Sequence, residues 1–279
     1  MIKLITSTAE FKNWRENVTE EIGLVPTMGN LHAGHLSLVQ EAAKNFSTVV
    51  VTIFVNPKQF GPNEDFARYP RTLEDDLELL RNIDSNVVVF APKTPNEIYP
   101  DSYATEISVP DLSRILCGKT RPTHFAGVTT VVYQLFMLTR PSCAYFGLKD
   151  YQQFKIIERM TLDLHLPLKL QGMPIIRDHD GLALSSRNRY LKADEREDAL
   201  KLYKTLIMAK EIVISKGCDA LSDFFNSQLK ITGWDYLEAR NATTLQEISP
   251  GDNLILLAGA RFVGSTRLID NLVVETDAR

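Results

Sequence analysis

The segment PTMGNLHAGH, at residues 26–35, contains residue types that bind phosphate and stabilise charge on it. It lies between a short apolar run and a stretch with helical spacing, where backbone N–H groups point toward a ligand. Gly29 and Gly34 allow close backbone approach, and His32 and His35 face one side of a first helical turn. The alternative is an ordinary turn with two surface histidines. The combination favours a nucleotide site with charge stabilisation at a phosphoryl oxygen.

A second polar segment, FVNPKQF at residues 54–60, follows the next apolar run. Asn56 and Gln59 offer uncharged donors and acceptors, which suit hydroxyl and carboxylate recognition in a pocket that excludes water. Taken alone, the segment would be an Asn-Pro turn at the end of a strand. Its predicted position beside the first segment favours substrate binding.

The third segment is GLKDYQQ, at residues 147–153. Lys149 provides a point cation for phosphate, Asp150 is a candidate helix cap, and Gln153 falls one turn further on the same face. A capped helix with a solvated lysine is an equally good interpretation of this segment by itself.

A dense cluster of hydrogen-bond donors lies in DGLALSSRNRYL, at residues 180–191. Ser185, Ser186 and Arg187 supply two hydroxyls and a guanidinium that matches phosphate geometry bidentately. A polar loop without a function is the alternative.

Two further segments give weaker signals. Arg121 and His124, in RPTHFAGV, are candidate binding residues. Asp75 and Asp76, in YPRTLEDDLELL, are candidate Mg²⁺ ligands. Carboxylates are also favoured in a first helical turn by the helix dipole alone, and the two interpretations of this pair stay open.

These segments require strands and helices that bring them together. Residues 22–25 and 48–55 are apolar and β-branched, as in strands buried on both faces, and residues 36–45 between them have helical spacing. Further helices are predicted at residues 72–80, 128–138 and 150–162, and further strands at 86–90, 143–146 and 168–173; a capping box at residues 7–10 predicts a first helix. The alternation predicts a Rossmann-like, doubly wound α/β domain with its ligand crevice at the carboxyl ends of the strands.

The pattern changes after about residue 175. Helices are predicted at residues 193–215 and 220–229, followed by strands at 234–239, 253–258 and 267–274. We therefore expect residues 1–175 to form the Rossmann-like domain and residues 176–279 to form a smaller α+β domain.

Composition restricts the class of protein. The chain has 279 residues, a formal net charge of −4, 44% hydrophobic residues and 24% charged residues. This balance argues against nucleic-acid or membrane partners. Three cysteines without metal-ligand spacing, and no signal peptide or long apolar run, predict a cytoplasmic protein.

Together these segments resemble the pantothenate synthetase (pantoate–β-alanine ligase) family of the nucleotidylyltransferase superfamily. The resemblance rests on LVPTMGNLHAGHLSLV, VTIFVNPKQF, YPRTLEDDL, EIYP, RPTHFAGVTTVV, YFGLKDYQQ, DGLALSSRNRYL and TRLIDN, in this order along the chain. It implies a homodimer in which residues 1–175 bind ATP and pantoate and the smaller C-terminal domain is a mobile lid. It also implies an enzyme that uses ATP, pantoate and β-alanine, requires Mg²⁺, and forms pantothenate through pantoyl adenylate with release of AMP and pyrophosphate.

The resemblance also implies roles for individual residues. His35 is the expected proton donor, and His32, His35, Lys149 and Arg187 are the expected catalytic group. Gln59, Gln153, Asn56, Arg121 and His124 are expected to bind pantoate and β-alanine. The expected ATP site comprises Met28, Gly29, Asn30, Leu31, His32, Ala33, Gly34, His35, Gly147, Leu148, Lys149, Asp150, Ile176, Leu184, Ser185, Ser186 and Arg187.

Three positions depart from the family pattern. Leu148 stands where glutamate is common, which removes a polar contact. His179 stands where lysine is common, which introduces a charge that depends on pH. Thr123 replaces a glycine, which restricts the backbone.

Two alternative functions remain open at the level of the sequence. One is another adenylylating enzyme of the superfamily, such as a mononucleotide adenylyltransferase or a reduced aminoacyl-tRNA synthetase. The other is a non-catalytic nucleotide-binding protein on the same fold, because fold alone does not establish function.

Overall fold

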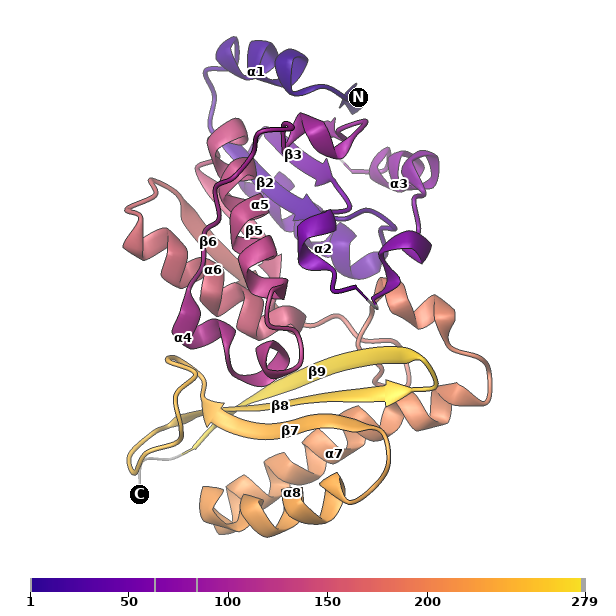
Figure 1. Ribbon diagram of the computed structural model, residues 1–279, viewed down its shortest axis with the longest axis vertical. Helices are drawn as coiled ribbons and strands as arrows, with labels where there is room; N and C mark the ends of the chain where they lie inside the picture. Colours follow the sequence, from indigo (N-terminus) through magenta and orange to yellow (C-terminus); the bar gives the residue numbers. More distant parts are fainter. Residues whose placement is uncertain (1, 63, 84, 277–279) are drawn as a thin grey trace.

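The computed structural model describes residues 2–62, 64–83 and 85–276. A six-stranded parallel sheet occupies one half of the molecule, and a three-stranded antiparallel sheet occupies the other (Figure 1). This arrangement confirms the predicted fold class. Within the described residues no helix has the length and apolar character needed to cross a membrane.

The parallel sheet has the strand order β1-β4-β3-β2-β5-β6. Its strands are β1 (Ile2–Ile5), β2 (Ile22–Thr27), β3 (Thr48–Ile53), β4 (Asn86–Phe90), β5 (Cys143–Gly147) and β6 (Lys169–Met173). From β2 the chain first builds outward through β3 and β4, and later adds β5 on the other side of β2. The order therefore reverses between β2 and β5, which is where doubly wound sheets bind ligands.

Helices cover both faces of this sheet. One face packs against α1 (Thr8–Glu16), α5 (His124–Thr139) and α6 (Tyr151–Asp163) through a core that includes Phe11, Phe136 and Ile157. The other face packs against α2 (Ala33–Asn45) and α3 (Leu73–Leu80). Burial on both faces explains why the strands are nearly continuous apolar runs.

The second half consists of β7 (Trp234–Asn241), β8 (Leu254–Val263) and β9 (Thr266–Glu275), packed against α7 (Glu195–Lys216) and α8 (Leu221–Leu229). The short helix α4 (Pro110–Ser113) lies in the first half. Leu116 and Phe125 of the first half share a buried cluster with Tyr236 and Leu256 of the second. The two halves are joined by a core, and the predicted division near residue 175 remains a prediction.

Among the described residues, all α-helices and β-strands were predicted from the sequence except two short elements, β1 and α4. β1 pairs in parallel with β4 at the edge of the sheet, and its four residues include the exposed Lys3 and Leu4. A short edge strand that is buried at only one end has no apolar run to reveal it. The predicted cap of α1 is confirmed, because the Ser7 side chain accepts a hydrogen bond from the Glu10 N–H.

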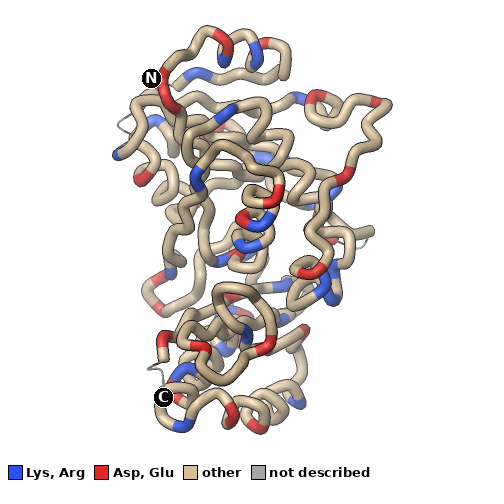
Figure 2. The backbone as a smooth tube through the Cα atoms, turned by 90° about the vertical axis from the view of Figure 1, so that its left-hand side faces the viewer, with Lys and Arg blue, Asp and Glu red and all other residues tan. Residues whose placement is uncertain are grey.

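Charges of both signs are interspersed along the chain (Figure 2). This distribution agrees with the small net charge of −4. Any site for a strongly anionic ligand must therefore be built locally.

Candidate active site

The loop after β2 is held in an unusual backbone conformation. Gly29 and Asn30 both have positive φ, 79° and 51°. The buried Asp76 of α3 accepts hydrogen bonds from the N–H of Asn30 at 2.9 Å and of Leu31 at 2.7 Å. Asp76 thus fixes the loop that leads into α2.

This role bears on the predicted Mg²⁺ ligands. Asp75 is exposed, whereas the Asp76 carboxylate is buried and engaged by backbone N–H groups. Within the described ranges, no three His, Cys, Asp or Glu side chains are grouped so that they could hold a metal ion. The hydrogen bonds assign Asp76 to loop positioning, and the role of Asp75 and Asp76 as Mg²⁺ ligands stays a prediction.

His32 and His35 lie side by side at the start of α2, with ring centroids 4.1 Å apart. His32 caps the helix, because its Nδ1 accepts a hydrogen bond from the Gly34 N–H at 3.1 Å. Burial, with the nearby Lys149 charge, lowers the pKa of His32 to about 4, and burial with the neighbouring His32 lowers the pKa of His35 to about 3. Burial therefore favours the neutral form of both rings.

A buried amide network follows β3. The Nδ2 of Asn56 donates to Gln59 Oε1 at 3.1 Å, and Asn56 Oδ1 accepts from the Tyr99 hydroxyl at 2.9 Å. The Gln59 carbonyl oxygen lies 2.7 Å from His124 Nδ1. Gly127 permits this packing, since a Cβ there would lie 2.2 Å from the Lys58 carbonyl oxygen. Asn56 is 1% exposed and orients Gln59 toward the site.

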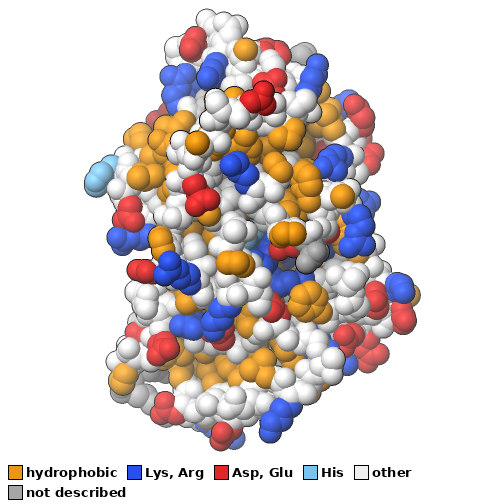
Figure 3. All heavy atoms as spheres, viewed as in Figure 1, with side chains coloured by type: hydrophobic (Ala, Val, Ile, Leu, Met, Phe, Trp, Pro, Cys, Tyr) orange, Lys and Arg blue, Asp and Glu red, His pale blue; other side chains and the backbone are white. Residues whose placement is uncertain are grey.

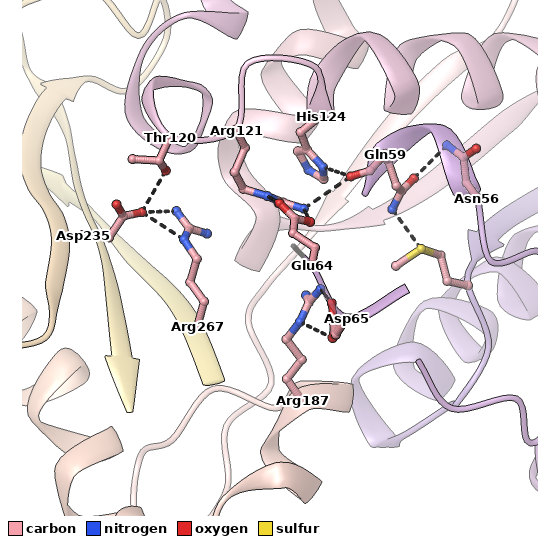
Figure 4. Close-up of polar contacts among 11 residues, drawn as sticks. Asn56, Gln59, Glu64, Asp65, Thr120, Arg121, His124, Arg187, Asp235 and Arg267 are labelled. Atoms are coloured by element: carbon pink, nitrogen blue, oxygen red, sulfur yellow. Dashed lines mark hydrogen bonds and ion pairs between the residues drawn. The ribbon is translucent and has the colours of Figure 1, made fainter. Parts of the chain in front are cut away.

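Two predicted guanidinium groups are already paired with carboxylates (Figure 4). Arg121 donates to both carboxylate oxygens of Glu64, and Arg187 donates to Asp65 at 3.1 and 2.9 Å. The pKa of each carboxyl is lowered, because the hydrogen bonds and charge of its arginine outweigh the opposing effect of burial. An anionic ligand must share or displace these carboxylates.

The β5 end of the crevice carries Lys149 in the short helix Leu148–Asp150. The ammonium of Lys149 lies 3.4 Å from Asp150 Oδ2. Asp150 is the N-cap residue of α6, at the predicted position, but its side chain makes no capping hydrogen bond. The carboxylate faces Lys149, where its hydrogen bond competes with capping.

The segment around residues 185–190 meets the loop after β2 directly. The Ser186 hydroxyl donates to the Asn30 carbonyl oxygen at 3.2 Å, and Arg189 donates to Asn30 Oδ1 at 2.6 Å. Two segments separated by about 150 residues, both predicted to bind nucleotide, are thereby brought into contact.

These elements surround a cavity of about 810 Å³, which is large enough for a nucleotide or a drug-sized ligand. It opens midway along the molecule, and basic side chains are visible in its depth (Figure 3). The predicted residues that line it are Met28, His35, Asn56, Gln59, Arg121, His124, Lys149, Asp150, Gln153, Ser185 and Arg187.

The other predicted residues lie outside its lining: Gly29, Asn30, Leu31, His32, Ala33, Gly34, Gly147, Leu148, Ile176, Leu184, Ser186, Asp75 and Asp76. Most of them belong to the loops that carry the lining residues.

Several lining residues were missed by the sequence analysis. Glu64 and Asp65 look like solvated charges in sequence, and the Val128, Val131 and Leu135 stripe looks like helix core. Arg267, from the motif TRLIDN, also lines the cavity and is paired with Asp235 at 2.6 Å.

Comparison with known proteins matches residues 3–273 to the pantoate-beta-alanine ligase family. The chain belongs to this family. It is 45% identical to the pantothenate synthetase of Thermosipho africanus, over 98% of this chain and 100% of that protein. It is 50% identical to that of Chromohalobacter salexigens, over 91% of each chain.

Solved structures of the same family agree with the fold. The crystal structure of pantoate-beta-alanine ligase (pantothenate synthetase) from Thermus thermophilus matches with a TM-score of 0.86 and 40% identity, over 98% of this chain and 99% of that one. The ligase from Francisella tularensis, complexed with beta-gamma ATP and beta-alanine, matches with a TM-score of 0.79 and 34% identity, over 98% of each chain.

The three departures from the family pattern have local explanations. Leu148 packs toward Gly172 of β6, outside the cavity lining. Thr123 has φ of −97°, an ordinary value that does not require glycine. The exposed side chain of His179 lies 2.9 Å from Asp178 Oδ1. None of the three alters the wall of the cavity.

Acid should destabilise the fold through its buried histidines. Burial, with the charge of Arg121, lowers the pKa of His124 to about 3, as it lowers those of His32 and His35. Because the unfolded chain binds these protons near pH 6.5, the stabilisation is complete above pH 6.5 and is lost as pH falls toward 4. Each histidine should contribute a slope of up to about 1.4 kcal/mol per pH unit.

Urea unfolding between pH 7.5 and 5.5 measures this slope, in a range where most carboxyl groups stay ionised. His124→Asn should flatten it, while His165→Asn, at an exposed position, should not. Identical slopes for both variants and the unchanged chain would contradict the assignment of His124.

Proposed function

We propose that the chain condenses pantoate with β-alanine at the expense of ATP, through pantoyl adenylate, releasing AMP and pyrophosphate. Membership of the family supports this activity. The observation that carries the site assignment is the cavity at the β2–β5 switch point, lined by His35, Lys149 and Arg187 beside Gln59 and Gln153. ATP and β-alanine are also the ligands named for the Francisella tularensis structure.

In the first half-reaction, the pantoate carboxylate attacks the α-phosphorus of ATP, and pyrophosphate leaves. Both nucleophiles come from substrates, so the protein contributes positioning and charge stabilisation. We assign ATP phosphates to Lys149, Arg187 and Ser185, which approach the crevice from β5 and from the 185–190 segment. Neutral His35 donates a hydrogen bond to a phosphoryl oxygen.

Pantoate suits the deeper part of the cavity. Gln59 and Gln153 supply amide groups for its carboxylate and hydroxyls, and the α5 residues Val128, Val131 and Leu135 supply an apolar wall for its dimethyl carbon. In the second half-reaction, the β-alanine amine attacks the activated carbonyl and AMP leaves. We propose that the C-terminal half acts as a lid and limits hydrolysis of the adenylate.

In the arginine–carboxylate pairs, protein carboxylates bind the guanidinium donors that we assign to anionic groups of the substrates. Glu64 and Asp65 form ion pairs with Arg121 and Arg187. Substrate phosphate or carboxylate groups then compete with these two side chains for the same donors.

We propose that Mg²⁺ enters with ATP, as a counter-ion of its phosphates. The described carboxylates form no ready-made cage, and Mg²⁺ commonly combines substrate phosphates and water with one or two protein carboxylates. The ion would supply charge neutralisation at the phosphates. Assembly as a homodimer, which the family resemblance implies, is part of the same proposal.

A choice of co-substrates separates this function from the alternatives. Purified chain should exchange labelled pyrophosphate into ATP with pantoate present, and should not do so with nicotinamide mononucleotide. Exchange supported by the mononucleotide would favour an adenylyltransferase. Calorimetric binding of ATP without turnover would favour a non-catalytic protein.

A further inference from the structure

Two adjacent buried polar residues of β9 reach across from the small sheet to the parallel-sheet half. Asp270 is 4% exposed and Asn271 is 5% exposed, and both belong to the motif TRLIDN. Neither lines the large cavity. Buried polar side chains are retained where their hydrogen bonds are satisfied, so their partners indicate what they do.

Asn271 holds the loop that carries Lys149. Its Nδ2 donates to the Leu148 carbonyl oxygen at 2.9 Å and to the Lys149 carbonyl oxygen at 2.8 Å. Two bonds from one amide to successive carbonyls fix the peptide planes on both sides of the Lys149 Cα. The small sheet therefore fixes the backbone position from which the Lys149 side chain extends.

Asp270 holds the second loop. Its carboxylate binds both terminal nitrogens of Arg177, at 2.6 and 2.9 Å. The Arg177 guanidinium also donates to the Gly181 carbonyl oxygen at 3.0 Å and lies 3.9 Å from the Tyr203 ring centroid. Arg177 pairs as an isolated bridge with Ala183, two residues before Ser185.

Both loops converge beside the same strand. Lys149, Ser185 and Asp270 line one small cavity, and Lys149 and Ser185 also line the main one. Gln153, by contrast, belongs to α6, which has its own anchor: the Gln152 amide bonds the Leu112 and Ile115 carbonyl oxygens at 2.8 and 2.7 Å. The direct hydrogen bonds of β9 thus reach the Lys149 loop and, through Arg177, the 177–187 loop. Asp270 and Asn271 also line a second small cavity together with Gln153.

We propose that Asp270 and Asn271 are positioning residues for adenylate formation, which together set the relative placement of Lys149 and the 177–187 loop. This inference rests on the proposed function for its kinetic consequence. Its geometric part, the holding of two loops by one strand, is independent of any activity. A misplacement of about 1 Å at a charge-stabilising group can lower a rate by roughly a hundredfold.

Three variants test the proposal. Asn271→Ala removes both donors, Asn271→Asp keeps the size and presents an acceptor to two carbonyls, and Asp270→Asn keeps the shape but loses the charge that binds Arg177. The matched control is Asn241→Ala, because Asn241 accepts two backbone hydrogen bonds at 2.9 Å, from Thr243 and Thr244, in the same sheet but away from the cavity.

The geometric part is measured by amide hydrogen exchange in the full chain. Exchange should become faster at residues 147–150 in the Asn271 variants and at residues 177–187 in Asp270→Asn, with the core strands unchanged. Asn241→Ala should leave both loops protected. Unchanged protection of the loops in Asn271→Ala and Asp270→Asn would overturn the proposal, whatever the activity of the chain.

The kinetic part of the proposal is tested by comparing the rate of adenylate formation with the affinity for pantoate. The pantoate-dependent ATP–pyrophosphate exchange rate should fall about tenfold to a hundredfold in the Asn271 and Asp270 variants. The Kd of pantoate, measured by calorimetry without ATP, should change by less than about threefold. Equal losses in both readouts, accompanied by a lower Tm, would indicate a purely structural role and contradict the proposal.

Failure of the proposed function has a different signature. If the unchanged chain shows no exchange activity at all, the reaction assignment is wrong, and hydrogen exchange still decides whether β9 holds the two loops. If the unchanged chain is active and all three variants match it in rate, the positioning role is wrong while the proposed function stands.

Discussion

Replacing Lys149 with alanine should slow adenylate formation by roughly a hundredfold or more. Lys149 lies at the carboxyl end of β5, at the edge where the strand order reverses, and its side chain lines the cavity. Among the described residues its ammonium forms one ion pair, with Asp150 at 3.4 Å, and it also faces the cavity. Single-turnover formation of the adenylate measures the effect.

The matched control for this prediction is Lys155→Ala. Lys155 lies further along α6, is paired with Glu158 and does not line the cavity. Its replacement should leave the rate within about threefold of the unchanged chain. A loss below about threefold in Lys149→Ala would remove Lys149 from the catalytic group.

Lys149→Ala should also change the titration of His32. Burial first, and the Lys149 charge second, lower the pKa of His32 to about 4. Removing the charge should therefore raise the pKa of His32, which an NMR titration measures. This shift would show that the two side chains face one another independently of any rate.

Replacing His35 with alanine should lower the same rate by roughly a hundredfold, the typical result of losing one stabilising donor. His35 lines the cavity, and its low pKa keeps the ring neutral at physiological pH. It should therefore act through a neutral N–H. The adenylation rate of the unchanged chain should therefore show no pH-dependent change near pH 6.5 that comes from His35. The pH profile of His35→Ala should have the same shape.

Two results would contradict this account of His35. One is a rate within about threefold of the unchanged chain, which would exclude a direct role. The other is a limb of the pH–rate profile near 6.5 that disappears in His35→Ala, which would indicate a protonated imidazolium as the acid. His165→Asn, at an exposed site away from the cavity, serves as the control.

Local sequence signals explain how much of the fold was predictable. The run of β-branched residues in β3 and the helical spacing in α2 specify a buried parallel sheet, because each reflects the environment of its own residues. β1 escaped prediction because it is a four-residue edge strand with two exposed residues, so it has no buried apolar run. Segments at the ends of neighbouring parallel strands were expected to meet at one edge of the sheet, and residues of these segments do line one cavity.

The pairing of individual side chains within the site was not predictable. The backbone N–H groups that the Asp76 carboxylate binds lie 45 and 46 residues away in the sequence, and nothing next to Asp76 indicates them. Glu64 and Asp65 belong to none of the predicted site segments, and they pair with the guanidinium groups of Arg121 and Arg187. These contacts depend on long-range packing, for which a single sequence carries no signal.

Isotope exchange between labelled pyrophosphate and ATP, catalysed by the unchanged chain, tests the proposed reaction. We expect exchange that requires pantoate and Mg²⁺ and proceeds without β-alanine, because adenylation precedes attack by the amine. Exchange in the absence of pantoate, or an absolute requirement for β-alanine, would contradict it.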